Sequence, residues 1–278
     1  MTKPALDRAS EAPAAHRPPA APWRLIYEYH LRVYRRTWRG SLTTKVLAPL
    51  FLLLSMGVGL GSLVNRSAGG IDVDGRAVPY LLFVVPAILG VTAMTTAMGE
   101  SSWPVLGAIT FFGGYNAMLA TPAEVLDILK AHCAYVLTQV MLASSLFLVV
   151  AGALGGFQSW RALWCLPVAV LVGLAFTTPV TAFTARLEDE GGFNVLFRLG
   201  QTPLMLFSGT FFPVGQLPTW LQPVAWVTPL WHGVEAERAL ALGTGSLVGV
   251  LSHLLALAGF AALGWWLALR SLRKRLVT

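Results

Sequence analysis

Apolar runs of about twenty residues alternate with shorter polar stretches along most of this chain. A helix needs about 20 mostly apolar residues to cross the hydrocarbon core of a bilayer, which is roughly 30 Å thick. The runs that meet this requirement are residues 45–64, 80–99, 131–154, 162–184, 193–212 and 247–269. The pattern therefore predicts an all-α polytopic membrane protein with six transmembrane helices.

Two different patterns precede the first apolar run. Residues 1–22 are rich in Pro and Ala without periodicity, which predicts a disordered cytoplasmic tail. In residues 23–39, one helical face carries Trp23, Tyr27, Leu31, Tyr34 and Trp38. Arginines fill the adjoining face, as in an amphipathic helix that lies in the membrane interface. A soluble amphipathic helix that packs on a partner is the alternative. Residues 40–278 then form the membrane domain.

The connection between the second and third apolar runs contains a helix start signal. The four residues from Thr121 to Glu124 match a capping box, with Pro122 at the first helical position. Asp127 lies near the positive end of the short helix that follows, and Lys130 lies near its negative end. We predict a short helix outside the membrane, with a simple connection between two spans as the alternative.

A segment rich in both Pro and Trp separates the fifth and sixth runs. Its characteristic residues are Pro213, Pro218, Trp220, Pro223, Trp226, Pro229 and Trp231, followed by Glu235. The prolines exclude one continuous helix, and the tryptophans favour the membrane–water boundary. We predict two short re-entrant helices, over 217–222 and 224–238, the first beginning at Pro218. A Pro-rich surface loop is the alternative.

Charge distribution gives the orientation. Of the 20 Lys and Arg residues, 16 fall on the side of the six-span topology that holds both chain ends. Because Lys and Arg are enriched in cytoplasmic loops, we predict a protein of the cytoplasmic (inner) membrane with both termini in the cytoplasm. The net charge of +7 is then explained by contact with anionic membrane lipids, and not by nucleic acid.

The candidate chemistry of the spans is sparse. Their central parts contain no Asp, Glu, Lys or Arg, which weakens the hypothesis of a carrier driven by protons or sodium. The chain lacks a phosphate-binding G-x-x-x-x-G-K-[ST] motif, so any ATP must be hydrolysed by another chain. Ser208 and His253 suggest a catalytic dyad only faintly, because the glycine that exposes such a serine is missing. We predict no enzyme activity, no metal site and no cofactor in this chain.

The stretch FSGTFFPVGQLP, with the Pro-Leu-Trp-His and Glu-Ala-Glu-Arg that follow it, resembles the signature region of type-2 ATP-binding-cassette (ABC) permeases. These are the membrane subunits of exporters such as the lipo-oligosaccharide (nodulation-factor) and daunorubicin-type systems. The resemblance is densest over residues 204–238 and 115–130, and elsewhere covers the chain only as a pattern of spans. It implies a separate ATPase dimer that binds ATP and Mg, and a second permease copy or a similar permease. It also implies that one segment is the coupling helix that contacts the ATPase: Thr121, Pro122, Ala123, Glu124, Asp127 and Lys130.

The resulting expectation is the permease subunit of an ATP-driven exporter for an amphiphile, either a lipid-linked saccharide, a lipid or a hydrophobic drug. An ATP-independent channel or carrier is the alternative. Candidates to line the pathway offer hydroxyl, amide, thioether and aromatic groups without charge: Met94, Thr95, Thr96, Gln201, Thr202, Phe207 and Ser208. For each of them, ordinary helix packing is the alternative.

Overall fold

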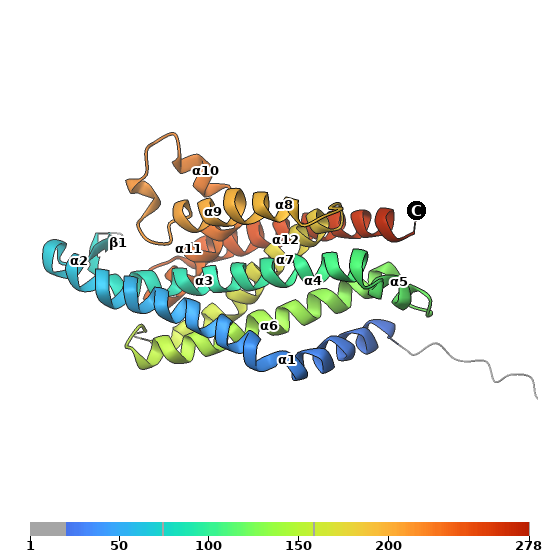
Figure 1. Ribbon diagram of the computed structural model, residues 1–278. Helices are drawn as coiled ribbons and strands as arrows, with labels where there is room; N and C mark the ends of the chain where they lie inside the picture. The colour runs from blue at the N-terminus through green and yellow to red at the C-terminus, as the bar shows by residue number, and fades with distance from the viewer. Residues whose placement is uncertain (1–20, 74, 158, 278) are drawn as a thin grey trace, which may run out of the picture.

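The structure is a computed structural model that describes residues 21–73, 75–157 and 159–277. It is a bundle of long helices, most of which run roughly parallel (Figure 1). The beginning of α1 and the C-terminus lie at one end, which we call the termini end, and a small hairpin lies at the opposite, hairpin end. The predicted disordered tail falls outside the described residues, apart from residues 21 and 22.

The helices follow one another with few long loops. Their bounds are α1 Pro22–Leu52, α2 Gly61–Ala68, α3 Tyr80–Glu100, α4 Trp103–Leu106, α5 Gly114–Leu119, α6 Val125–Ala153, α7 Cys165–Thr184, α8 Gly191–Asn194, α9 Thr202–Phe207, α10 Gln222–Trp226, α11 Pro229–Leu242 and α12 Leu247–Leu276. π-helical turns join several of them, at Leu53–Leu60, Gly107–Phe111 and Val195–Gln201, and 3-10 turns occupy Trp160–Trp164 and Val214–Gln216.

The all-α membrane class is confirmed. Five helices in the described part of the chain are long and apolar enough to cross a membrane: Leu47–Ser67, Tyr80–Phe111, Val125–Ala153, Trp160–Thr184 and Leu247–Leu276. The run expected as the fifth span is a helical stretch made of α8, a π-helical turn and α9, and it is not among the five. It ends at Phe207, shortly before Gly209, whose φ of 77° is left-handed. Six spans therefore remain a prediction.

Two helices that were expected as separate elements are continuous with their neighbours. The expected interfacial helix 23–39 and the start of the first span belong to α1, which bends in its middle (Figure 1). The expected short helix near 121–130 is the first part of α6, which continues into the third span. No proline falls between the expected elements in either case, so nothing in the backbone chemistry ends the helix there.

A short antiparallel hairpin in the loop between the first two spans was not predicted. Strand β1, Ile71–Val73, pairs with β2, Arg76–Val78. The turn uses Gly75 at φ 78°, and the Gly75 N–H donates to Asp72 Oδ1 over 2.8 Å. The hairpin lies at the end of the bundle opposite the C-terminus (Figure 1).

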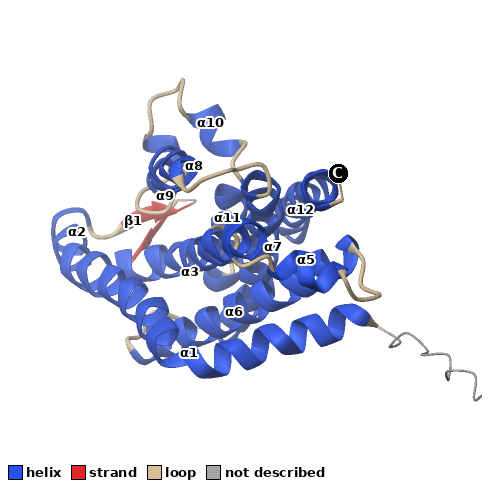
Figure 2. Ribbon diagram, turned by 45° about the vertical axis from the view of Figure 1, so that its right-hand side comes forward, coloured by secondary structure: helices blue, strands red, loops and turns tan. Residues whose placement is uncertain are grey.

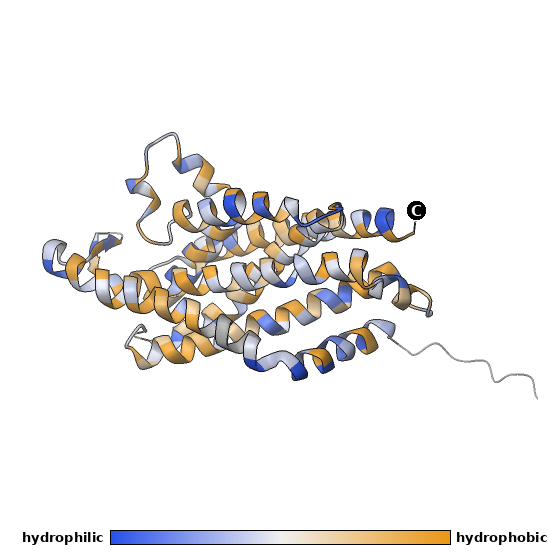
Figure 3. Ribbon diagram, viewed as in Figure 1, coloured by the Kyte–Doolittle hydropathy of each residue, from blue (hydrophilic) through white to orange (hydrophobic). Residues whose placement is uncertain are grey.

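The core of the bundle forms around α3. Figure 2 shows α3 between α1, α6, α7 and α11, with α12 on the far side of α7, and α3 packs against α6, α7 and α11. Figure 3 shows apolar residues along most of the helices, with hydrophilic residues in the first half of α1, in the last turns of α12 and around the hairpin. The first two of these regions lie at the termini end, where the sequence places most of its Lys and Arg residues.

Candidate functional site

The segment predicted to be a coupling helix lies at the termini end, but its cap differs from the prediction. The N-cap of α6 is Glu124, not Thr121, and the capping box joins Glu124 to Asp127. The Glu124 N–H donates to Asp127 Oδ2 over 3.1 Å, whereas the Thr121 hydroxyl donates to the Met118 carbonyl over 2.6 Å. The side chains of Glu124 and Asp127 each accept from the backbone N–H of the other residue. This pairing fixes the start of α6 directly after Glu124, where the chain leaves the turn that follows α5. Thr121, Pro122, Glu124 and Lys130 are exposed, and Ala123 and Asp127 are half-buried.

The beginning of α1 lies beside this segment and forms a cleft with it. The cleft has a volume of about 470 Å³ and is lined by Pro22, Leu25, Ile26 and Tyr29 of α1 and by Gly114, Ala117, Met118, Thr121, Pro122 and Ala123. Leu25 and Tyr29 are each 54% exposed. We call this the α1–α5 cleft. A neighbouring face of α1 is covered by α6, because Tyr27 Oη pairs with Thr138 Oγ1 at 2.9 Å and His30 stacks on Tyr135.

The candidates to line the pathway occupy two different environments. Met94, Thr96 and Ser208 are buried within the chain, and Ser208 Oγ pairs with Thr228 Oγ1 at 3.0 Å. Thr95 and Gln201 are half-buried. Thr202 and Phe207 are exposed on α9, as is Leu206, and Val195 and Leu199 are exposed on the π-helical turn that precedes it. The exposed candidates therefore gather on α9, and the buried ones pack inside a single copy of the chain.

The Pro/Trp segment has helices at other positions than predicted. The backbone around Pro218 and Trp220 is not helical, and the prolines in the first turn of a helix are Pro223, the second residue of α10, and Pro229, the first of α11. Thr228 caps α11 by accepting from the Trp231 N–H over 3.3 Å. A proline at the first helical position costs no hydrogen bond, because that N–H has no helical partner. The prediction chose the wrong proline because Pro218, Pro223 and Pro229 are all chemically suited to start a helix.

Helix α11 brings charged residues into the packed core. It packs against α3, α7 and α12. Arg238 Nη1 lies 2.6 Å from Glu235 Oε1, and Arg238 Nη2 donates to the Gly209 carbonyl over 2.8 Å. The guanidinium also lies 3.9 Å above the ring of Phe83 on α3. The Arg238 side chain is 5% exposed and that of Glu235 is 33% exposed, so the guanidinium is the buried partner. Its bond to the Gly209 carbonyl holds α11 to the chain just after α9.

Glu237, the neighbour of Arg238, is fully buried, and neither of its carboxylate oxygens has a hydrogen-bond partner in the structure. Burial raises the pKa of Glu237 well above its ordinary value, against the opposing effects of the nearby Gly90 backbone N–H and of the positive charge of Arg238. A raised pKa favours the neutral acid, which is the form that an apolar environment tolerates. The expected absence of ionisable groups concerned only the six expected spans, so this buried acid on α11, between the last two of them, was not predicted.

A cleft at the hairpin end is lined by aromatic and charged side chains, among them the ion pair of Glu235 and Arg238. It has a volume of about 370 Å³. Its aromatic wall consists of Phe83, Trp226 and Trp231, and its polar wall includes Asp72, Glu235, Arg238 and His253. We call it the Trp–Arg cleft. Such a surface can hold an apolar group against the rings and a polar group against the charges.

A second buried ion pair ties three helices together. Lys45 Nζ lies 2.6 Å from Glu100 Oε1 and donates to Gln139 Oε1 over 3.0 Å, which links α1, α3 and α6. Both charged side chains are mostly buried, with exposed fractions of 13% and 17%. Lys45 begins the first expected span and Glu100 directly follows the second, and the pair between them was not predicted. Opposite charges at the same membrane boundary are the signal that could have suggested it.

The faint serine–histidine dyad does not form. Ser208 pairs with Thr228, whereas His253 Nδ1 lies 2.9 Å from His232 Nδ1. Cys165 is buried and its thiol donates to the Glu237 carbonyl over 3.3 Å. These side chains serve packing and hydrogen bonding and offer no activated nucleophile.

Comparison with known proteins places the chain among transporters. A family model described as ABC-2 type transporter matches residues 23–242. Nodulation protein J of Rhizobium leguminosarum bv. trifolii is 31% identical over 255 residues, which cover 92% of this chain and 94% of that protein. Nodulation protein J of Rhizobium meliloti has the same identity and coverage, and that of Sinorhizobium fredii is 29% identical over 94% of this chain and 97% of that protein.

Proposed function

This chain belongs to the ABC-2 type transporter family, and from that premise we propose that it exports an amphiphile with energy from a separate ATPase. Family membership makes it a membrane subunit of a transporter and not an enzyme. The proposal concerns its substrate, its partners and its mechanism. ATP and Mg bind to the ATPase in this scheme, and no cofactor binds to the chain itself.

The α1–α5 cleft is our candidate for the ATPase contact. It joins Thr121, Pro122 and Ala123, the start of the predicted coupling segment, to the beginning of α1, so the coupling segment and the predicted interfacial helix share one surface. That surface lies at the termini end, the end we propose to be cytoplasmic because it carries most Lys and Arg residues. Closure of the ATPase on ATP would push this surface, and α6 would carry the movement into the bundle because it is one helix from Val125 to Ala153. ATP must bind one of the two states more tightly to drive the change.

A second copy of the chain completes the pathway in this proposal. Two surface helices offer apolar faces with helical spacing, namely Leu47, Phe51, Leu54 and Val58 on one, and Val195, Leu199 and Leu206 on the other. The exposed pathway candidates Thr202 and Phe207 lie on the second helix. Pairing of two copies through these faces would place them along the seam.

The lining of the Trp–Arg cleft supports an amphiphile as the class of substrate. Aromatic rings beside a guanidinium and a carboxylate suit a molecule with an apolar and a polar part. A lipid-linked saccharide, a lipid and a hydrophobic drug all have this character. The buried Glu237 is the observation that favours the alternative, an ATP-independent carrier, because carriers use buried acids to bind coupling ions.

The first experiment is purification of the tagged full chain in mild detergent, followed by identification of partners and an assay of ATP hydrolysis. Recovery of an ATPase in a fixed ratio, with hydrolysis stimulated by one of the three substrate classes, supports the exporter. Substrate flux in vesicles that proceeds equally without ATP would establish the carrier instead.

The coupling surface is tested by a variant that keeps the helix start. Pro122→Ala, Glu124→Ser and Lys130→Gln together remove exposed groups, and Ser remains a good N-cap for α6. We expect ATPase recovery and transport to fall at least about tenfold, with normal insertion in the membrane. The matched control, Pro218→Ala with Arg76→Gln at the hairpin end, should keep both. Full recovery and transport in the first variant would show that the ATPase binds elsewhere.

A further inference from the structure

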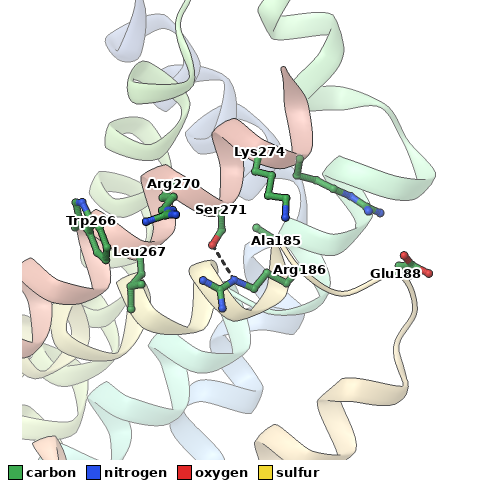
Figure 4. Close-up of a pocket in the computed structure, with 9 residues that line it drawn as sticks. Ala185, Arg186, Glu188, Trp266, Leu267, Arg270, Ser271 and Lys274 are labelled. Carbon is green, nitrogen blue, oxygen red and sulfur yellow. Dashed lines mark hydrogen bonds between the residues drawn. The ribbon is translucent and has the colours of Figure 1, made fainter. Parts of the chain in front are cut away.

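A third cavity lies at the termini end, and neither the coupling surface nor the pathway uses it. It has a volume of about 640 Å³ and lies between α12 and the connection from α7 to α8 (Figure 4). We call it the basic pocket, and its lining is Ala185, Arg186, Glu188, Trp266, Leu267, Arg270, Ser271, Lys274 and Arg275. Four of these side chains are cations and one is an acid, so the pocket favours an anion.

The side chains of the basic pocket are arranged by their neighbours. Arg186 Nε donates to Ser271 Oγ over 3.0 Å, which ties the end of α7 to α12 (Figure 4). The Arg270 guanidinium carbon lies 5.6 Å from the centre of the Trp266 ring. In the part of the chain that the structure describes, no ion pair joins Glu188 to Arg186, Arg270 or Arg275. The planar guanidinium groups match the oxygens of a phosphate.

The length of α12 sets the depth of the pocket in a membrane. Its 30 residues rise about 45 Å at 1.5 Å per residue, which exceeds the roughly 30 Å hydrocarbon core. About 20 residues from Leu247 reach Trp266, so the cations Arg270–Arg275 fall in the headgroup layer. Trp266 is 55% exposed and sits where tryptophan rings mark the boundary of the hydrocarbon.

An exposed apolar stripe leads along α12 to the pocket. Leu251, Leu255, Leu263 and Trp266 are exposed by 47%, 72%, 57% and 55%. They follow the helical spacing of one face, and Arg270 continues that face into the pocket. Gly259 lies on the same face, and a Cβ there would meet no atom within 4 Å. The stripe has the length and character to lie against acyl chains.

We propose that the basic pocket binds the phosphate of an anionic phospholipid, whose acyl chains lie along the apolar stripe of α12. A lipid fits better than a free phosphate because the stripe and the pocket are continuous. It fits better than an acidic protein surface because Trp266 and Leu267 form part of the lining. The bound headgroup would hold α12 to the connection before α8. This site is independent of the exported substrate and of the ATPase contact.

The test uses the purified full chain in neutral detergent, with phosphatidylglycerol and phosphatidylcholine titrated in native mass spectrometry. We expect phosphatidylglycerol to bind at least about tenfold more tightly. Arg270→Gln, Lys274→Gln and Arg275→Gln together should remove that preference, since each cation near anionic lipid contributes about a fivefold effect. Arg270→Lys with Arg275→Lys should keep most of it. The matched control, Arg32→Gln, Arg35→Gln and Arg36→Gln in α1, removes the same charge at the same end and should keep it fully.

Three outcomes would overturn the proposal. Equal binding of the two lipids, or an equal loss in the α1 control, would show that no specific lipid site exists at α12. Displacement of the lipid by inorganic phosphate at millimolar concentration would show a site for the anion alone. Loss of the ATPase from the triple Gln variant with lipid preference intact would show a protein contact surface.

Discussion

Helices α3 and α12 are equally apolar, yet they occupy opposite environments in the bundle. The mean hydropathy of the most apolar window is 2.0 in both, but 89% of that window is buried for the span containing α3 and only 22% for α12. Hydropathy therefore identifies a membrane helix without saying whether other helices or lipids surround it. Lipid tails are as apolar as leucine, so moving a leucine from lipid to a site between helices gains no hydrophobic free energy.

Small residues and hydrogen bonds distinguish the packed faces. On α3, Gly90 lets Glu237 and Val234 of α11 approach, with a Cβ at Gly90 placed 3.0 Å from Glu237 Oε2. On α12 only one side is packed, where Gly264 meets Thr178 and Pro179 of α7. The Thr178 hydroxyl donates to the Ala261 carbonyl of α12 over 3.1 Å. The other side of α12 carries large exposed residues and offers no close approach.

The largest expected change in the free energy of unfolding comes from breaking the α11 ion pair, and breaking an exposed ion pair on α1 is the comparison. Arg238→Ala should lower the free energy of unfolding by about 3–5 kcal/mol, because Glu235 and the Gly209 carbonyl lose their partner inside the protein. Arg32→Ala breaks a pair with Glu28 whose side chains are 78% and 54% exposed, so its effect should be far smaller. Unfolding in a titration with SDS measures both. Equal effects would mean that the α11 pair is solvated in the membrane.

The next effect compares two glycines of α12. Gly264→Val should cost about 3 kcal/mol, because a side chain there meets the Pro179 backbone nitrogen at 2.7 Å and the Thr178 hydroxyl. Gly259→Val faces open space and serves as the matched control. We expect a lowered unfolding midpoint in detergent for the first variant only. A stable Gly264→Val protein would show that α12 can move away from α7 without loss.

Much of the fold could be predicted because span length and proline chemistry are local properties. The second span was predicted to within one residue at its end, as residues 80–99 against Tyr80–Glu100. Predictions that required a choice among equally suitable residues were less accurate. Glu124 and Thr121 can both cap a helix, and Pro218 and Pro229 can both start one. Tertiary packing makes that choice, and no local pattern records it.

The charged interior was missed for a different reason. The Glu-Ala-Glu-Arg run was assigned to the re-entrant segment, because the prolines before it exclude one continuous helix. Its burial depends on the neighbouring helices, and on Gly90 and Gly233 giving it room. The same argument applies to Lys45 and Glu100, which are 55 residues apart in the chain. Pairs of this kind become visible only once the helices are placed side by side.

The smallest expected change in the free energy of unfolding compares a buried and an exposed leucine within one turn of α12. Leu257 is fully buried against the core and Leu255 is 72% exposed, although both are leucines of α12. Leu257→Ala should lower the free energy of unfolding by about 2 kcal/mol, the low end of the range for this substitution. The substitution leaves a cavity in the core, but the leucine side chain gains little by moving from lipid into that core. Leu255→Ala should leave the free energy of unfolding nearly unchanged, since lipid fills the space. An equal loss at Leu255 would show that a partner, such as a second copy, covers the stripe, and the assignment of that face to lipid would then be wrong.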